Sequence, residues 1–193
     1  MAILPIYNCF HPVLKKKTEE VTNFDGELKK FVDDMLETMY HADGIGLAAN
    51  QVGHSKSVIV LDMSVSNDDK YRNAKPIIMI NPRIHSFSEE EVELSEGCLS
   101  VPKFFEDVSR PAQIQVQYWD IDMKEYKSEE GDFVSRVMQH EIDHLNGILF
   151  FEKLSPLRRA LSRSKLRKIE KGDTLSFYSM ILPNGKLIER EVE

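Results

Sequence analysis

The segment His140-Glu141-Ile142-Asp143-His144 limits what this chain can fold into more than any other part of its sequence. It lies in the range 132–146, where apolar residues recur at helical spacing and Gly147 follows as a left-handed stop. Residues four apart share one face of a helix, so both imidazoles can reach a single metal ion. Glu141 lies beside them, where it can accept a proton from water at that ion. The pattern predicts the metal site of a hydrolase.

Two histidines leave a third protein ligand to be found. The metzincin protease pattern would place a histidine at position 150, but this chain has Phe150. The carboxylate of Glu170 is one candidate, and it would make the chain a zinc metalloprotease. The thiolate of Cys98 is another, because thiolates suit borderline metals. A free cysteine is more often a small buried apolar residue, so the residues alone leave this choice open.

A second polar cluster is the glycine- and alanine-rich stretch 44–51. Small residues let the backbone approach a ligand closely, and Gln51 offers an amide donor. The same composition also suits a loop that closes a helix against a strand, and for the stretch taken alone we expect such a loop. The stretch alone predicts no function.

The apolar spacing predicts a first helix over 24–40 and a third helix that begins near Ser155, a capping residue followed by Pro156. Strands are expected over 57–63 and 113–120, with 125–128 as a hairpin partner, and over 76–80 before an Asn81-Pro82 turn. Asn184-Gly185 predicts a final hairpin within 177–192. Strands and helices without a regular βαβ alternation indicate an α+β fold.

Composition narrows the class of protein further. No apolar run approaches the length of a membrane span, and no cleavage-site pattern follows the first residues, so we expect a cytoplasmic protein. The net charge of −7 argues against general nucleic-acid binding. Residues 153–171 differ from the rest, because they hold eight Lys or Arg against Glu170 alone.

Three segments, taken together, resemble the signature of the peptide deformylases. The family's GIGLAA-x-Q, EGCLS and QHE-x-DHL motifs match 44–51, 96–100 and 139–145 in the same order. The resemblance extends more loosely over about 3–168, and the last hairpin has no match. It implies antiparallel and mixed strands packed around a central metal-binding helix. We expect residues 1–172 to form the catalytic domain and 173–193 a β-hairpin extension of it.

The resemblance also implies an activity, which is removal of the N-formyl group from the N-terminal methionine of newly synthesised polypeptides, with release of formate. One ion per chain would be bound by Cys98, His140 and His144, and it is Fe²⁺ in the family, where Zn²⁺, Ni²⁺ or Co²⁺ can substitute. Glu141 would transfer protons. The Gln51 amide and the backbone N–H of Leu99 would stabilise the oxyanion.

The resemblance places Gly44, Ile45 and Gly97 against the substrate backbone. Helical spacing before His140 nominates Phe133, Arg136 and Val137 for the pocket of the methionine side chain. Phe133 and Val137 suit that pocket. Arg136 does not, so either its stem lines the rim with the guanidinium in solvent, or the helix is rotated from the orientation that this spacing gives.

Asp143 lies within the metal motif. Its carboxylate is expected either to orient a ligand histidine or hold a nearby arginine, for which Arg110 is a candidate, or to lie exposed on the helix. A rival of another class is a binding module with a purely structural ion. It would need a fourth ligand, and no residue stands at a convincing spacing.

The basic segment 155–171 predicts a docking surface for the ribosome, as in some members of the family. Leu157, Leu161 and Ile169 would hold it on the core. The guanidinium and ammonium groups of Arg158, Arg159, Arg163, Lys165 and Arg167 would be left largely exposed. The alternative is a solvated helix whose charges offset the acidic remainder of the chain.

Overall fold

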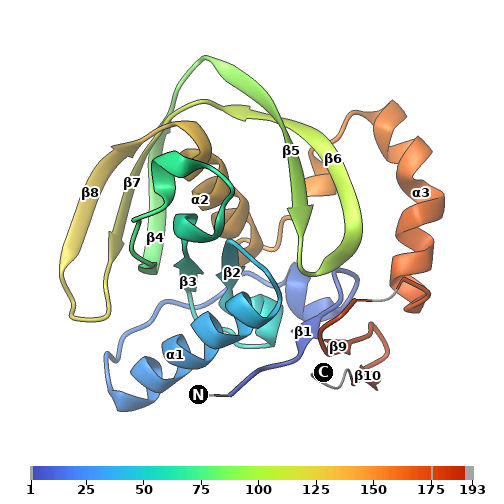
Figure 1. Ribbon diagram of the computed structural model, residues 1–193, viewed down its shortest axis with the longest axis horizontal. Helices are drawn as coiled ribbons and strands as arrows, with labels where there is room; N and C mark the ends of the chain where they lie inside the picture. Colours follow the sequence, from blue (N-terminus) through green and yellow to red (C-terminus); the bar gives the residue numbers. More distant parts are fainter. Residues whose placement is uncertain (1, 175, 190–193) are drawn as a thin grey trace.

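The computed structural model describes residues 2–174 and 176–189, and within them three α-helices form (Figure 1). They are α1 (Gly26–His41), α2 (Asp132–Leu145) and α3 (Pro156–Lys171), close to the predicted ranges. Asp25 caps α1 and Ser155 caps α3. Short 3₁₀ helices are η1 (Pro12–Lys15), η2 (Ala49–Val52), η3 (Met63–Val65), η4 (Asp69–Tyr71) and η5 (Phe150–Glu152).

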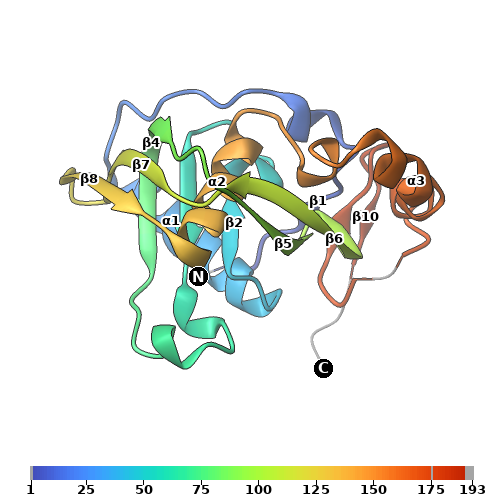
Figure 2. The ribbon, with the colours of Figure 1, turned by 90° about the horizontal axis from the view of Figure 1, so that it is seen from above.

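A five-stranded antiparallel sheet forms the largest layer. Its order is β2 (Gly46–Ala48), β3 (Val58–Leu61), β4 (Ile77–Phe87), β7 (Ile114–Trp119) and β8 (Glu125–Glu130). All four residues of β3 are buried. Because side chains alternate along a strand, Val58 and Val60 pack with α1, and Ile59 and Leu61 pack with α2. The sheet therefore separates the two helices. Figure 1 shows α1 below β2 and β3 and α2 above them, and Figure 2 shows β4, β7 and β8 to one side of α2.

A long two-stranded hairpin, β5 (Glu91–Cys98) and β6 (Val101–Pro111), lies beyond α2. The sequence patterns did not predict it. Phe104 and Val108 of β6 are buried and join the apolar cluster that contains Phe150 and Leu154. This cluster holds the hairpin on the segment between α2 and α3, so the hairpin stands opposite α2.

The chain ends meet in a small third sheet. β9 (Met180–Ile181) pairs in parallel with β1 (Ile6–Tyr7) and antiparallel with β10 (Leu187–Ile188). The turn between β9 and β10 holds Gly185 at a φ of +81°, so the predicted hairpin is confirmed. Residues 190–192 of the predicted run lie outside the described residues. The division into 1–172 and 173–193 stays a prediction.

Two local predictions were wrong. Asn81-Pro82 is not a turn but an irregularity inside β4, where the register to β7 shifts between Ile80 and Arg83. Asn81 has a φ of +51°, and its side chain bonds the backbone N–H and C=O of Val21, at 2.8 and 2.9 Å. The stretch 44–51 is not only a loop, because it contains β2 and most of η2.

The packing of α3 also differs from the prediction. Ile169 is buried at 2% exposure, but Leu157 and Leu161 are 70% and 74% exposed. The buried side of α3 instead includes Ser162, whose hydroxyl donates to Glu106. Arg158 is only half-exposed, since it pairs with Glu93 at 2.9 Å. Within the described residues, no helix is both long and apolar enough to cross a membrane.

Candidate metal centre and active site

Helix α2 and strand β5 supply the central side chains of the site. Residues four apart share one face of the helix, and residues two apart share one face of the strand. His140 and His144 are one helical turn apart on α2, so their rings lie on one face, with centroids 5.0 Å apart. Glu96 and Cys98 are two residues apart near the end of β5, so both side chains point to the same side of the hairpin. The two elements face each other, and these four side chains meet between them.

Cys98, His140 and His144 offer ligand atoms that all lie within 4.8 Å of one another. Sγ of Cys98 is 3.2 Å from Nε2 of His144. Burial holds the pKa of His144 well below its ordinary value, which keeps its imidazole neutral. In their deprotonated forms, one cysteine thiol and two histidine rings make a donor set that suits Fe²⁺, Zn²⁺, Co²⁺ or Ni²⁺.

The alternative carboxylate ligand is not part of this cluster. Glu170 is exposed on α3, and it lines a different groove with Phe10 and Arg167. Among the described residues, the triad of Cys98, His140 and His144 is the group of three potential ligands that the structure brings together. The alternative of a zinc metalloprotease depended on Glu170 as the third ligand, and the geometry does not support it.

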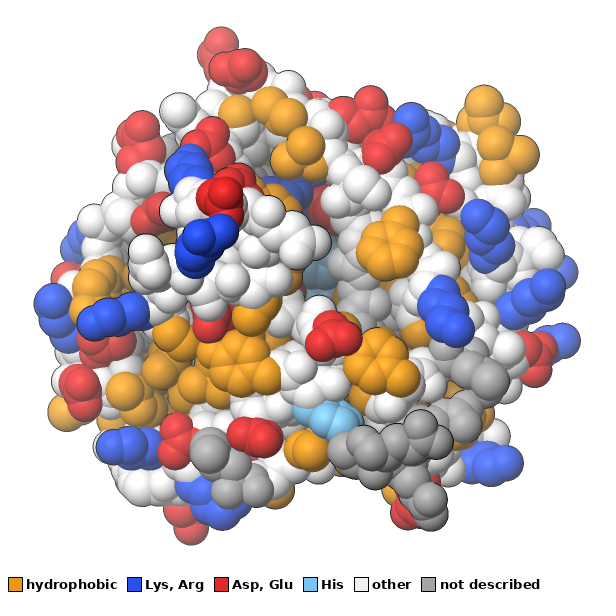
Figure 3. All heavy atoms as spheres, in the orientation of Figure 1, with side chains coloured by type: hydrophobic (Ala, Val, Ile, Leu, Met, Phe, Trp, Pro, Cys, Tyr) orange, Lys and Arg blue, Asp and Glu red, His pale blue; other side chains and the backbone are white. Residues whose placement is uncertain are grey.

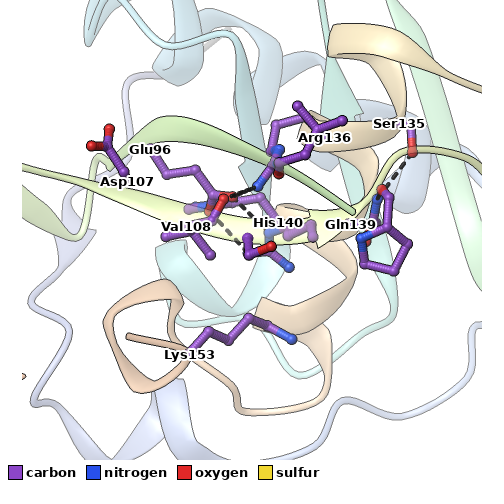
Figure 4. Close-up of polar contacts among 12 residues, drawn as sticks. Glu96, Asp107, Val108, Ser135, Arg136, Gln139, His140 and Lys153 are labelled. Carbon is purple, nitrogen blue, oxygen red and sulfur yellow. Dashed lines mark hydrogen bonds and ion pairs between the residues drawn. The ribbon is translucent and has the colours of Figure 1, made fainter. Parts of the chain in front are cut away.

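Glu96 is a buried hub beside the triad. Its carboxylate accepts a hydrogen bond of 2.9 Å from Nδ1 of His140, so Nε2 is the ring atom left to bind a metal ion when the imidazole is neutral (Figure 4). It also accepts from Arg110 at 2.6 and 2.9 Å and from Arg136 at 2.7 Å. Burial favours the neutral acid, but the hydrogen bonds from His140 and Arg110 outweigh it, so the pKa of Glu96 stays far below its usual range.

The prediction that the guanidinium of Arg136 lies in solvent was wrong. The residue is 5% exposed, and its guanidinium points from α2 toward the hairpin. It donates to the backbone C=O of Val108 at 2.8 Å and to that of Val92, in addition to Glu96. Because Val92 is on β5 and Val108 on β6, Arg136 ties α2 to both strands of the hairpin.

Asp143 holds Arg110, the partner nominated from the sequence. Nη1 of Arg110 donates to Oδ2 of Asp143, while the same guanidinium binds Glu96. Lys153 approaches Asp143 at 3.2 Å. Arg110 thus joins the β6 strand to α2 next to the triad, and the reading of Asp143 as a freely exposed helix residue is wrong.

Glu141 lies in the same cavity as the triad, and its fit depends on a glycine. A Cβ at Gly46 would lie 2.6 Å from Oε1 of Glu141, so any larger residue there would displace the carboxylate. Burial raises the pKa of Glu141 to about 7, with His140 and Arg110 opposing the rise. In the described residues, Oε2 of Glu141 is buried without a hydrogen-bond partner. The carboxylate therefore has an oxygen available for another molecule.

Gln51 presents its amide nitrogen to the triad. Its Oε1 accepts from the backbone N–H of Ala48 at 2.8 Å, which fixes the orientation of the amide. Nε2 then lies 3.5 Å from Sγ of Cys98 and 3.3 Å from Oγ of Ser100. The neighbouring Asn50 donates from its side chain to the backbone C=O of His144 at the end of α2. η2 is therefore joined to both β5 and α2.

A cavity of about 470 Å³ opens over the triad. Figure 3 shows this face hollowed near its centre, with histidine atoms at the bottom and hydrophobic side chains around the rim. Cys98 and His140 of the triad line this cavity. The other residues nominated from the sequence that line it are Gly44, Ile45, Gln51, Gly97, Leu99, Phe133, Arg136, Val137 and Glu141. His144 lies behind them, at 1% exposure.

Among the contributions to this cavity that were not predicted from the sequence are those of Glu96, of strand β6 and of the segment before β9. Glu96 had no role beyond marking a motif, although its place two residues before Cys98 in an extended run could have signalled a shared side. Ser176, Phe177 and Tyr178 line the cavity from the segment before β9. No local pattern indicates that this segment returns to the site, because its position depends on the pairing of β9 with β1.

A thiol and two imidazoles beside a buried carboxylate, at the base of an apolar cleft in an α+β fold, define a metal-dependent hydrolase. Comparison with known families is more specific. The model of the family described as polypeptide deformylase matches residues 3–160, and the chain belongs to this family.

Individual relatives agree with this assignment. A peptide deformylase of Salinibacter ruber is 38% identical over 191 residues, covering 96% of this chain and 98% of that protein. One of Cellvibrio japonicus is 44% identical over 171 residues, covering 89% and 98%. The predicted activity is thus confirmed: the enzyme removes the N-formyl group from newly synthesised polypeptides.

Solved structures show the same fold. A peptide deformylase from Legionella pneumophila superposes with a TM-score of 0.79 at 37% identity, covering 89% of this chain and 98% of that one. A plant peptide deformylase reaches a TM-score of 0.81 at 34% identity, with coverages of 88% and 90%. The predicted α+β class with antiparallel sheets is confirmed.

Proposed function

We propose that Cys98, His140 and His144 bind one divalent metal ion, and that Glu141 transfers the protons of deformylation. The observation that carries this proposal is the convergence of the three ligand atoms within 4.8 Å in the cavity that Glu141 also lines. When bound, such an ion lowers the pKa of water and polarises a carbonyl. Fe²⁺ is the ion that the family resemblance implies, with Zn²⁺, Ni²⁺ or Co²⁺ as substitutes.

In this proposal α2 is the central metal-binding helix of the fold. It lies between the five-stranded sheet and the β5–β6 hairpin (Figure 1). Glu96 orients His140 through Nδ1, as carboxylates orient many ligand histidines. The catalytic domain would comprise residues 1–172, with 173–193 as its hairpin extension.

Glu141 would take a proton from the attacking water and later deliver it to the amine nitrogen that leaves. Its burial and its unpartnered Oε2 support this role, because a catalytic base needs direct access to the proton it accepts. The Gly46 backbone packs against the carboxylate and limits its position.

Negative charge develops on the formyl oxygen as water adds, and Gln51 and Leu99 would stabilise it. The amide nitrogen of Gln51 already faces the triad, since its oxygen is held by Ala48. Leu99 follows Cys98 in the turn of the β5–β6 hairpin, so its N–H would be the second donor. One such donor contributes about 3 kcal/mol to transition-state stabilisation.

The substrate would lie between two strand edges. β2 is the outer strand of its sheet, and β5 pairs with β6 alone among the described strands. Gly44 and Ile45 on one side and Gly97 on the other could then pair with the peptide backbone. Phe133 and Val137 from α2 line the same cavity and would contact the methionine side chain.

We further propose a cytoplasmic site of action and contact between α3 and the ribosome. Arg159, Arg163, Lys165 and Arg167 are exposed along α3 and form the surface that would meet phosphate groups. The acidic remainder of the chain disfavours binding to nucleic acid in general.

The direct test is formate release from formyl-methionyl peptides by protein prepared anaerobically and loaded with iron. Cys98→Ala should lose both metal and activity, and Glu170→Ala should keep both. The result that would overturn the proposal is a Cys98→Ala protein that still holds one ion per chain and still releases formate.

A further inference from the structure

Two aromatic side chains stand at the cavity with most of their surface in water. Phe105 of β6 is 68% exposed, and Phe177, from the segment before β9, is 57% exposed. Both line the cavity that contains the triad. Exposed large aromatics beside a binding cleft gain free energy when a ligand covers them.

The ring of Phe105 is positioned by strand β5, which also carries Cys98. It pairs across the hairpin with Gly97, and a Cβ at Gly97 would lie 2.3 Å from its ring. The ring therefore packs directly on the backbone next to Cys98. Its position is defined by the strand that carries the proposed metal ligand.

Phe177 is positioned through its neighbour Tyr178. Tyr178 is buried at 6% exposure, and its hydroxyl donates a hydrogen bond of 2.6 Å to the backbone C=O of Leu99. The two rings contact each other edge to face, with centroids 5.2 Å apart. The Tyr178 anchor thus fixes the segment against the turn of the β5–β6 hairpin and leaves Phe177 at the cavity.

We propose that Phe105 and Phe177 form an apolar subsite for the side chains that follow the formyl-methionine. This inference rests on the proposed function, in which the formyl group lies at Cys98 and the methionine contacts Phe133 and Val137. Those two residues come from α2, whereas Phe105 and Phe177 come from β6 and the C-terminal segment. The cavity therefore has a second apolar wall built from different elements, and the continuing peptide is the molecule that must pass it.

The test compares kcat/KM for two amidated peptides, formyl-Met-Leu-Phe and formyl-Met-Ser-Ser. The ratio of the two values is measured within each protein, so differences in metal content or active fraction cancel. Wild type should prefer the apolar peptide. In Phe177→Ala and in Phe105→Ala the ratio should fall by about 5- to 20-fold. Phe177→Leu, which keeps an apolar contact, should retain most of the preference.

The chain offers a matched control in Phe87, at the end of β4. It is 57% exposed, as Phe177 is, and it is not among the residues that line the cavity. Phe87→Ala should leave the ratio unchanged. The proposal is overturned if wild type shows no preference, or if both cavity variants keep the wild-type ratio. No formate from either peptide with wild type would instead refute the proposed function.

Sedimentation of the same proteins tests whether Phe105 and Phe177 instead bind a second copy of the chain. We expect one protomer at every concentration for wild type and for Phe177→Ala. Association that Phe177→Ala abolishes and Phe87→Ala leaves intact would assign the aromatic pair to a protein interface and overturn the subsite.

Discussion

Oε2 of Glu96 and Nδ1 of His140 are 2.9 Å apart, and this hydrogen bond links the hairpin to α2 at the candidate metal centre. The carboxylate also binds Arg110 and Arg136, and all four side chains are buried. A single residue therefore orients a proposed metal ligand and forms ion pairs with two buried guanidinium groups.

We predict that Glu96→Gln weakens metal binding by about 10- to 100-fold, because His140 loses the acceptor that orients its ring. The free energy of unfolding should also fall by about 3–5 kcal/mol, since the buried guanidinium of Arg136 loses its charge partner and that of Arg110 keeps only Asp143. Metal titration and urea denaturation measure the two effects. Glu89→Gln, at an exposed carboxylate in the turn before β5, is the control and should change neither quantity.

Glu141→Gln should bind the metal almost normally and lose activity by about 10²- to 10⁴-fold in kcat. The amide cannot accept the proton of the attacking water, although it fits the space beside Gly46. Metal analysis and formate release, measured on the same sample, separate the two properties. Activity within a few-fold of wild type would contradict the role of Glu141 as the base.

Activity of the iron-loaded enzyme should decay in air, and peroxide should hasten the loss. Both Fe²⁺ and the thiolate of Cys98 are open to oxidation, and Cys98 is only partly buried. The measurement is residual formate release against time for the Fe²⁺ form and the Ni²⁺ form. Equal lifetimes of the two forms would argue against damage at iron.

Reversing the charge of Arg159, Arg163 and Arg167 to Glu should abolish ribosome binding and leave deformylation of a short free peptide unchanged. Arg158 is left intact, because it bonds Glu93 and the backbone C=O of Asp107. Wild-type binding should weaken with salt, as phosphate contacts do. Co-sedimentation with ribosomes at several salt concentrations is the assay.

The control for that experiment reverses the charge of three exposed lysines that are not part of α3, namely Lys16, Lys17 and Lys75. Its net charge equals that of the α3 variant, so only the location differs. If both variants sediment with ribosomes as wild type does, α3 has a structural role only and does not bind the ribosome.

The helices could be predicted from the sequence because their signals are local. Ser155 accepts from the N–H of Arg158, and Pro156 stands at the first position of α3, as its cap pattern indicates. The side that α3 buries could not be predicted, because it depends on a distant strand. Glu106 of β6 binds Ser162, and Leu157 and Leu161 remain in water.

The β5–β6 hairpin escaped prediction for a related reason. β5 carries three glutamates and exposes most of its residues, so its sequence resembles a loop. Its stability comes from pairing with β6 and from Arg136, which reaches both strands from α2. An arginine at helical spacing before His140 gives no hint of carbonyl partners 28 and 44 residues away.

The candidate site was predictable where one element carries the pattern. His140, Glu141 and His144 follow from a single helix. The choice between Cys98 and Glu170 did not follow from local patterns, because 46 residues separate Cys98 from His144. It rested on the family resemblance, and the folded chain brings Cys98, not Glu170, to the two histidines.

The hydrogen bond from Tyr178 to Leu99 has a consequence for how the enzyme itself is made. Translation delivers residues 98, 140 and 144 before residues 176–178, so a nascent copy holds every proposed metal ligand while one wall of its cleft is still unmade. Strand β1 is synthesised first, and it cannot pair with β9, its parallel partner, until almost the whole chain has been synthesised. Chains fold in units as they emerge, and contacts between distant residues form late. A chain that ends after α3 would therefore hold every proposed metal ligand and lack one side of the substrate cavity.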